Sequence, residues 1–159
     1  IFSYQWPLKS VTYIINRYLN HPVYLYEIFL VYKNERLQAI IVLRKVSQYN
    51  RVALRIVDFI GLNSVISSLY IMIKDLLHVY EAEYIDIYST GIPNDILKEA
   101  GFMNRFEENN VIIPNYFEPF VRKNIDLNYG YFVNGFHPLI RLFKGDGDQD
   151  RPRQIKGLN

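Results

Sequence analysis

The sequence contains no cysteine, which excludes disulfides, a thiolate nucleophile and zinc sites built from cysteine. No apolar run approaches the roughly 20 residues that a membrane-spanning helix needs. Lys and Arg number 18 against 16 Asp and Glu, and this near-balance gives no electrostatic case for nucleic acid or an anionic membrane as a partner. The first residues, IFSYQW, lack the basic start and apolar core of a signal peptide. We therefore expect a cytoplasmic domain, and we expect a fragment of a longer chain because residue 1 is Ile.

The composition predicts a folded domain with a sizeable core. Half of the 159 residues are apolar and 16% are aromatic, whereas disordered segments lack the apolar surface that offsets chain entropy. This length suits one domain and is short for two. We therefore expect a single domain over residues 1–159, with a neighbouring domain in the full-length chain as a possible partner.

Hydrophobic spacing in the first half predicts a helix, three strands and then a longer helix. Runs of β-branched and aromatic residues are separated by the short polar turns KNE and SQYN, which is typical of an antiparallel meander. The long helix has one apolar face, and Asn63 or Ser64 is expected to cap its start. These elements are predicted at residues 11–19, 23–32, 37–46, 51–61 and 64–80.

The second half predicts shorter elements. A strand at 84–89 should run parallel to the strand at 51–60, because the helix between them is the crossover that a parallel pair needs. A short helix should end at Gly101 with a left-handed C-cap. A hairpin around residues 109–110 and two strands within 124–133 and 138–145 complete the expected α+β fold.

Several segments carry a resemblance to a known family. NDILKEAGF (residues 94–102) resembles the short helix, Gly-Phe and strand of the GNAT superfamily of acyl-CoA-dependent N-acyltransferases. Five further segments extend the resemblance over nearly the whole chain: RYLNHP, RIVDFIG, EYIDIYSTGIP, IIPNYFEPF and GDGDQDRP. Together they are similar to acetyltransferase-like domains encoded beside bacterial surface-glycan genes. The resemblance implies a mixed, largely antiparallel twisted sheet with flanking helices, and transfer of an acyl group from a thioester to an amine, such as an amino sugar.

The same resemblance implies where a donor cofactor would bind. In the superfamily, a basic loop of the form Q/R-x-x-G-x-G/A holds the coenzyme A pyrophosphate at a helix start, where unpaired backbone donors attract an anion. The corresponding stretch is FIGLNSVISSLY, which places cofactor contacts at Gly61, Asn63 and Ser64. This stretch has one glycine and no basic residue, so we expect acetyl-CoA or another acyl-CoA to bind weakly or not at all.

The resemblance also implies roles for residues on the two parallel strands. Asp58 stands where many superfamily members carry a glutamate general base, and apolar surroundings bring a carboxylate closer to useful base strength. Alternation sends Tyr84, Asp86 and Tyr88 to one face, which lines a cleft or meets solvent. In the implied cleft, Tyr88 would reprotonate the leaving thiolate and Asp86 would bind an amine or hydroxyl, with Tyr84 beside it.

These residues have other interpretations that the sequence leaves open. Asp58 could form an ion pair with Arg44 or Arg55 and have no catalytic part. The aromatic residues Tyr116 and Phe117, with Phe120, would form a wall on which an acceptor sugar stacks, or would simply pack within their loop.

A metal site is not expected. No histidine has a metal-ligand partner at i+4, and the alternating aspartates of FKGDGDQDRPR fail the calcium-loop pattern, because Arg151 and Gly157 stand where it needs Gly and Glu. We expect a structural turn with its aspartates paired to Lys144, Arg151 and Arg153. Alternatively, these aspartates reach the acceptor cleft and bind hydroxyls or an ammonium group.

Three hypotheses for function follow. The first is an N-acyltransferase that acts on a small-molecule or sugar-linked amine. The second is a non-catalytic binding or interaction module of the same fold within a larger protein, which the missing pyrophosphate loop favours. In the third, a carrier protein delivers the acyl group, so that the loop is not needed.

Overall fold

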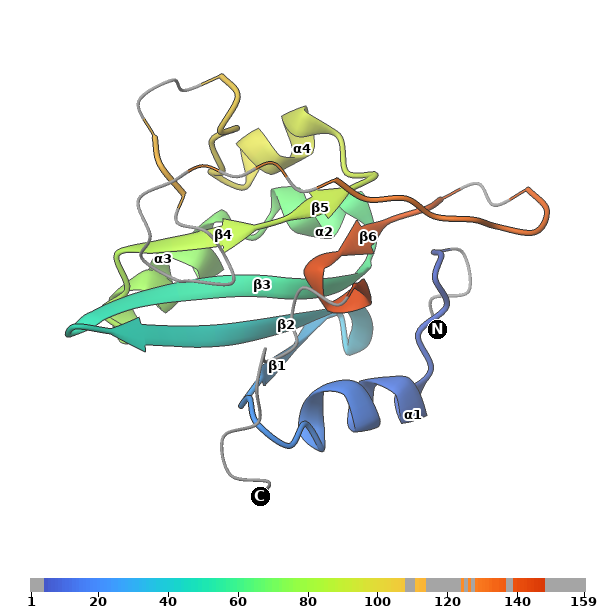
Figure 1. Cartoon of the computed structure of the whole chain (residues 1–159), viewed down its shortest axis with the longest axis horizontal. Coiled ribbons are helices and arrows are strands. Elements are labelled where there is room, and N and C mark those ends of the chain that lie inside the picture. The colour runs from blue at the N-terminus through green and yellow to red at the C-terminus, as the bar shows by residue number, and fades with distance from the viewer. Residues whose placement is uncertain are drawn as a thin grey trace.

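A four-stranded sheet with strand order β1-β2-β3-β4 organises the fold (Figure 1). The computed structural model describes residues 5–107, 111–113, 124, 126, 128–136 and 139–147. The strands are β1 (Glu27–Lys33), β2 (Arg36–Gln48), β3 (Arg51–Gly61) and β4 (Tyr84–Ile87). The first three pair antiparallel and β4 pairs parallel to β3, which confirms the predicted meander and the predicted parallel pair. The fold is therefore α+β, with a mixed and mostly antiparallel sheet.

Two tight turns join the strands of the meander. Asn34 and Glu35 have φ values of 50° and 61°, and Tyr49 and Asn50 have φ values of 50° and 60°. Positive φ at both central residues is the geometry of a two-residue turn whose twist matches that of the paired strands. The polar turns predicted from KNE and SQYN are thus confirmed.

Different helices cover the two faces of the sheet (Figure 1). On one face lie α2 (Asn63–Ser67), α3 (Tyr70–Val79) and α4 (Asn94–Glu99). They enclose the larger core, whose buried members include Ala39, Ile41, Leu43, Leu54, Ile56, Phe59, Val65, Ile66, Leu69, Ile73 and Leu76. On the other face, α1 (Val11–Ile14) and the π-helical turn η1 (Ile15–Leu19) pack Ile14 and Tyr18 against Val42, Val57 and Ile60.

The long helix predicted over 64–80 is two helices, so that prediction is wrong in detail. The Ser68 hydroxyl donates to the Val65 carbonyl at 2.7 Å, and the Leu69 amide donates to the Ile66 carbonyl in a tighter turn. Serine hydroxyls that compete for helical carbonyls in this way commonly bend or end a helix. The predicted cap is also wrong: the N-cap residue of α2 is Leu62, and no side chain caps it.

The described residues of the second half contain fewer strands than predicted. α4 ends before Gly101, whose φ of 89° confirms the left-handed position. β5 (Ser89–Thr90) pairs antiparallel with β6 (Leu142–Phe143), and the 3₁₀ turn η2 (Lys144–Asp146) follows. Residues 102–107 and 128–133 hold no strand, contrary to the prediction, and the predicted turn at 109–110 lies outside the described residues.

Candidate functional site

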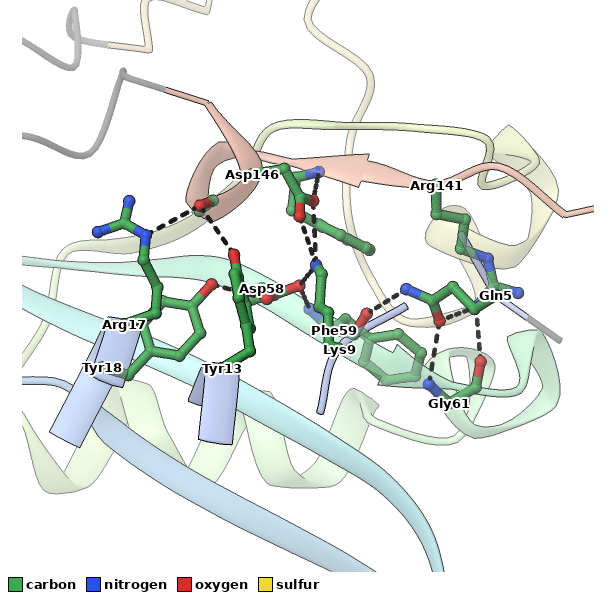
Figure 2. Close-up of polar contacts among 12 residues, drawn as sticks. Gln5, Lys9, Tyr13, Arg17, Tyr18, Asp58, Phe59, Gly61, Arg141 and Asp146 are labelled. Carbon is green, nitrogen blue, oxygen red and sulfur yellow. Dashed lines mark hydrogen bonds and ion pairs between the residues drawn. The ribbon is translucent and has the colours of Figure 1, made fainter. Parts of the chain in front are cut away.

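The parallel strands β3 and β4 pair only over part of β3. The paired residues run from Ala53 to Ile56 on β3 and from Tyr84 to Ile87 on β4. β3 continues to Gly61, and this last part meets side chains from the two ends of the described chain instead of β4 (Figure 2). The candidate site lies where the two strands separate.

Two buried side chains take the place of a neighbouring strand there. Gln5 donates from Nε2 to the Phe59 carbonyl at 3.0 Å and accepts from the Gly61 amide at 3.4 Å. Arg141 donates from Nη1 to the Gly61 carbonyl at 2.5 Å. β2 pairs with one edge of β3 as far as Gly61, whereas β4 pairs with the other edge only as far as Ile56. Because unpaired backbone groups are costly to bury, the contacts of Gln5 and Arg141 let that second edge lie buried beyond β4.

The segments that carry Gln5 and Arg141 are also bonded to each other. The Trp6 amide donates to the Leu139 carbonyl at 2.8 Å, and the Arg141 amide donates to the Trp6 carbonyl at 2.9 Å. The two segments therefore form one unit that lies along β3.

Asp58, the predicted general base, is fully buried at the centre of a polar network (Figure 2). Its Oδ1 accepts from Lys9 Nζ at 2.5 Å and from the Phe59 amide at 2.8 Å, and its Oδ2 accepts from the Tyr18 hydroxyl at 2.6 Å. Its charge partner is Lys9, whereas Arg55, one of the two arginines suggested by the sequence, pairs with Asp86. Both carboxylate oxygens are therefore engaged.

Lys9 joins two carboxylates from distant parts of the chain. Its Nζ lies 2.5 Å from Asp58 Oδ1 and 2.9 Å from Asp146 Oδ1, and its side chain is 1% exposed. Asp146 Oδ2 also accepts from the Phe143 amide at 2.8 Å. Asp146 thus pairs with a residue at the other end of the chain, whereas the sequence predicted local partners such as Lys144.

Burial and neighbouring charges both shift the pKa values of these groups. Burial pushes the pKa of Lys9 down, but the charges of Asp58 and Asp146 outweigh it, so the pKa lies above its usual 10.5. Burial raises the pKa of Asp146 against the opposing effect of Lys9. Burial, followed by the charge of Asp58, raises the pKa of Tyr18, so its hydroxyl stays protonated and remains a hydrogen-bond donor.

A second polar cluster lies on β4. Asp86 is buried, and its Oδ2 lies 3.3 Å from Nε of Arg55, which is also buried. Burial raises the pKa of Asp86, while the charges of Arg55, Lys144 and Arg44 oppose that shift. Ile85 and Ile87 pack against the larger core, as the alternation predicted. The solvent-facing alternative is wrong for Asp86, because its side chain is only 4% exposed.

Tyr84 and Tyr88 lie on either side of Asp86 and are half-buried. Burial, followed by the charge of Asp86, raises the pKa of both hydroxyls, which therefore stay protonated at neutral pH. Lys144 Nζ lies 4.3 Å from the centroid of the Tyr88 ring. Because η2 carries both Lys144 and Asp146, this short turn links the β4 cluster to the Asp58 network.

Two of the three residues predicted to bind a cofactor, Gly61 and Asn63, are already in contact with Arg141. Gly61 is buried, and Arg141 donates both to its carbonyl and to Asn63 Oδ1. A side chain at Gly61 would have its Cβ 2.6 Å from the Ala39 Cβ. Of the three predicted residues, only Ser64 is exposed.

Other predicted residues lie outside the described part of the chain. These are Tyr116 and Phe117, together with Phe120, Asp148 and Asp150. In the described ranges, no group of three His, Asp or Glu side chains that could hold a metal ion occurs.

The residues that the sequence did not single out are Gln5, Lys9, Tyr18 and Arg141. One signal was present: Lys9 is the single charged residue among the first sixteen. A lone charge in an apolar segment is often buried and paired.

Comparisons with protein-family models, curated proteins and solved structures found no match to this chain. Among the residues that the structure describes, no helix is long and apolar enough to cross a membrane.

Proposed function

We propose that this chain is an acyltransferase-like domain that moves an acyl group from a thioester to an amine, with an amino sugar as the acceptor. The observation that carries the proposal is the parallel pair β3–β4, which is joined through α2 and α3 and separates beside buried carboxylates. In the superfamily that the sequence resembles, the acyl donor lies between the corresponding strands. The substrate class rests on that resemblance.

In the proposed reaction, the amine nitrogen attacks the thioester carbonyl carbon, a C–N bond forms and the C–S bond breaks. A carboxylate takes the proton from the amine, and the leaving thiolate takes the proton of the Tyr88 hydroxyl. Holding the two substrates in contact would supply much of the rate. The raised pKa of Tyr88, which burial causes, keeps its hydroxyl protonated until the thiolate leaves.

Asp58 and Asp86 are the two candidates for the base. Asp58 already accepts three hydrogen bonds, so it is equally suited to positioning Lys9 and Tyr18. Asp86 has a pKa raised by burial, which brings it toward the range that a base needs at neutral pH.

A screen of thermal stability tests the proposal, because a ligand that binds only the folded chain raises its melting temperature. The donors are acetyl-CoA, longer acyl-CoAs and an acylated carrier protein, and the acceptors are nucleotide-linked amino sugars. A pair that stabilises the protein should then release free thiol when mixed with it. If no donor stabilises the protein or yields thiol, the proposal fails.

A second candidate function is a non-catalytic binding module of a larger protein. Gln5 and Arg141 favour it, because they occupy the edge of β3 and, with Asn63, the helix start where a donor would bind. This candidate predicts stabilisation by an amino sugar without thiol release from any donor.

A further inference from the structure

An uncharged aromatic segment leaves the body of the fold. This segment, residues 128–136 and here called the aromatic arm, has the sequence NYGYFVNGF. Figure 1 shows it running away from the β5–β6 sheet before the chain returns to β6. Phe132 and Phe136 are 95% and 91% exposed, and Tyr129 and Tyr131 are 64% and 54% exposed.

The aromatic arm exposes more apolar surface than scattered surface residues do. Aromatic side chains bury about 150–250 Å² each, so these four leave on the order of 600 Å² exposed. Single exposed apolar residues are ordinary, but a contiguous patch of this size marks an interaction surface. Aromatic residues are also among the types enriched at protein interfaces.

A groove lies at the base of the aromatic arm. Its volume is about 330 Å³, and no charged residue lines it. The body of the fold contributes Trp6, Pro7, Ile140 and Leu142, and the aromatic arm contributes residues 131–134. An aromatic side chain from another molecule therefore has an apolar recess beside the aromatic arm.

We propose that two copies of this chain associate through the aromatic arm, with the arm of each copy seated in the groove of the other. The projecting side chains and the recess lie next to each other, so one two-fold contact uses both twice. Neither surface carries a charge, so the same surface can meet itself without like-charge repulsion. The arm has no Lys or Arg to attract anionic lipid or nucleic acid.

The area supports a reversible dimer. Two arms that bury their exposed aromatic surface account for on the order of 1,200 Å², the lower end of the range for specific interfaces. The dimer should therefore form as concentration rises through the micromolar range and dissociate on dilution.

Sedimentation velocity over a dilution series tests whether the dimer forms, and the fluorescence of Trp6 tests whether the groove takes part in the contact. Trp6 is the single tryptophan and lines the groove, so its emission should shift to shorter wavelength as the dimer forms. Phe132→Ser and Phe136→Ser should each weaken the dimer at least tenfold and abolish the shift at the same concentrations. Leu25→Ser is the matched control, because Leu25 is 90% exposed and lies outside the arm.

Several results would overturn the proposal. These are a monomer at every concentration, a dimer that both phenylalanine substitutions leave unchanged, or a dimer that forms without a change in Trp6 emission. A Trp6 shift caused by added oligosaccharide in a protein that stays monomeric would assign the arm to a sugar ligand instead. Circular dichroism of each variant verifies that it is folded.

Discussion

Lys9 donates a hydrogen bond of 3.0 Å to Asp146, which lies 137 residues further along the chain. The same ammonium contacts Asp58 on β3, so one buried group connects the first segment, the sheet and the last described turn. A buried charge is costly unless it is paired, and removing one partner leaves the others uncompensated. The three side chains therefore stabilise the fold only as a complete set.

Lys9→Met should strongly destabilise the protein. It leaves the carboxylates of Asp58 and Asp146 buried together without a cation, which costs about 3–5 kcal/mol for a buried pair. The free energy of unfolding, measured in urea, gives the change. Adding Asp146→Asn to Lys9→Met should recover part of the loss, because one of the two unpaired charges is then removed.

Lys98→Met is the matched control. Lys98 forms an ion pair with Glu107 at 2.7 Å, but both side chains are about half exposed. Exposed pairs contribute about 0–1 kcal/mol, so the control should lose little stability. Equal losses in the two variants would show that the buried contact does not form in solution.

The protein should unfold cooperatively in alkali. The folded-state pKa values of Lys9, Tyr13 and Tyr18 lie above their usual values of 10.5, 10.0 and 10.0. A raised folded-state pKa gives stability that is fully present below the unfolded value and is lost as pH rises through the folded value. Stability should therefore fall steadily above about pH 10.

Tyrosine absorbance near 295 nm measures this directly. In the native protein, some of the 14 tyrosines should ionise only as the protein unfolds. In denaturant, all of them should ionise near pH 10. A native titration that matches the denatured one would mean that Tyr13 and Tyr18 are not shielded as the structure places them.

Local patterns were enough to predict the framework of the fold. Strand alternation and two polar turns gave the meander, and the apolar-faced crossover gave the parallel pairing of Ala53–Ile56 with Tyr84–Ile87. The break at Ser68 depends on which carbonyl its hydroxyl contacts, and periodicity does not carry that information. The hairpin expected around 109–110 and the strand expected within 124–133 had weak alternation, and in the described ranges 102–107 and 128–133 no partner strand pairs with them.

The sequence predicted the buried carboxylates of the candidate site but not the residues that pair with them. Asp58 and Asp86 stood out as carboxylates within apolar strands, and both are buried. Their partners come from other parts of the fold: Lys9 from the first segment and Arg55 from the neighbouring strand. Gln5 satisfies the backbone of β3 only because β4 turns away, and that separation is a tertiary feature.

Coenzyme A should bind this chain weakly or not at all. The helix start at Asn63 has no basic loop, and Arg141 already contacts both Gly61 and Asn63. Isothermal calorimetry with acetyl-CoA provides the measurement, and a low-micromolar dissociation constant would contradict this expectation. Arg141→Met, compared with the exposed Arg36→Met, shows whether Arg141 is what excludes the ligand.

If Asp58 is the base, Asp58→Asn should lower turnover by roughly 10²–10⁴-fold with little change in substrate affinity, because general-base assistance acts on the transition state. An asparagine oxygen still accepts the hydrogen bond from Tyr18, so circular dichroism and the melting temperature must show that the variant is folded.

Asp86→Asn is the comparison, since Asp86 is expected to bind the amine and its loss should mainly raise the KM for that substrate. Unchanged turnover in Asp58→Asn would leave Asp58 as a residue that positions Lys9 and Tyr18. If Asp86→Asn then abolishes turnover, Asp86 is the base. If the unsubstituted protein shows no turnover at all, the result favours the second candidate function, a non-catalytic binding module.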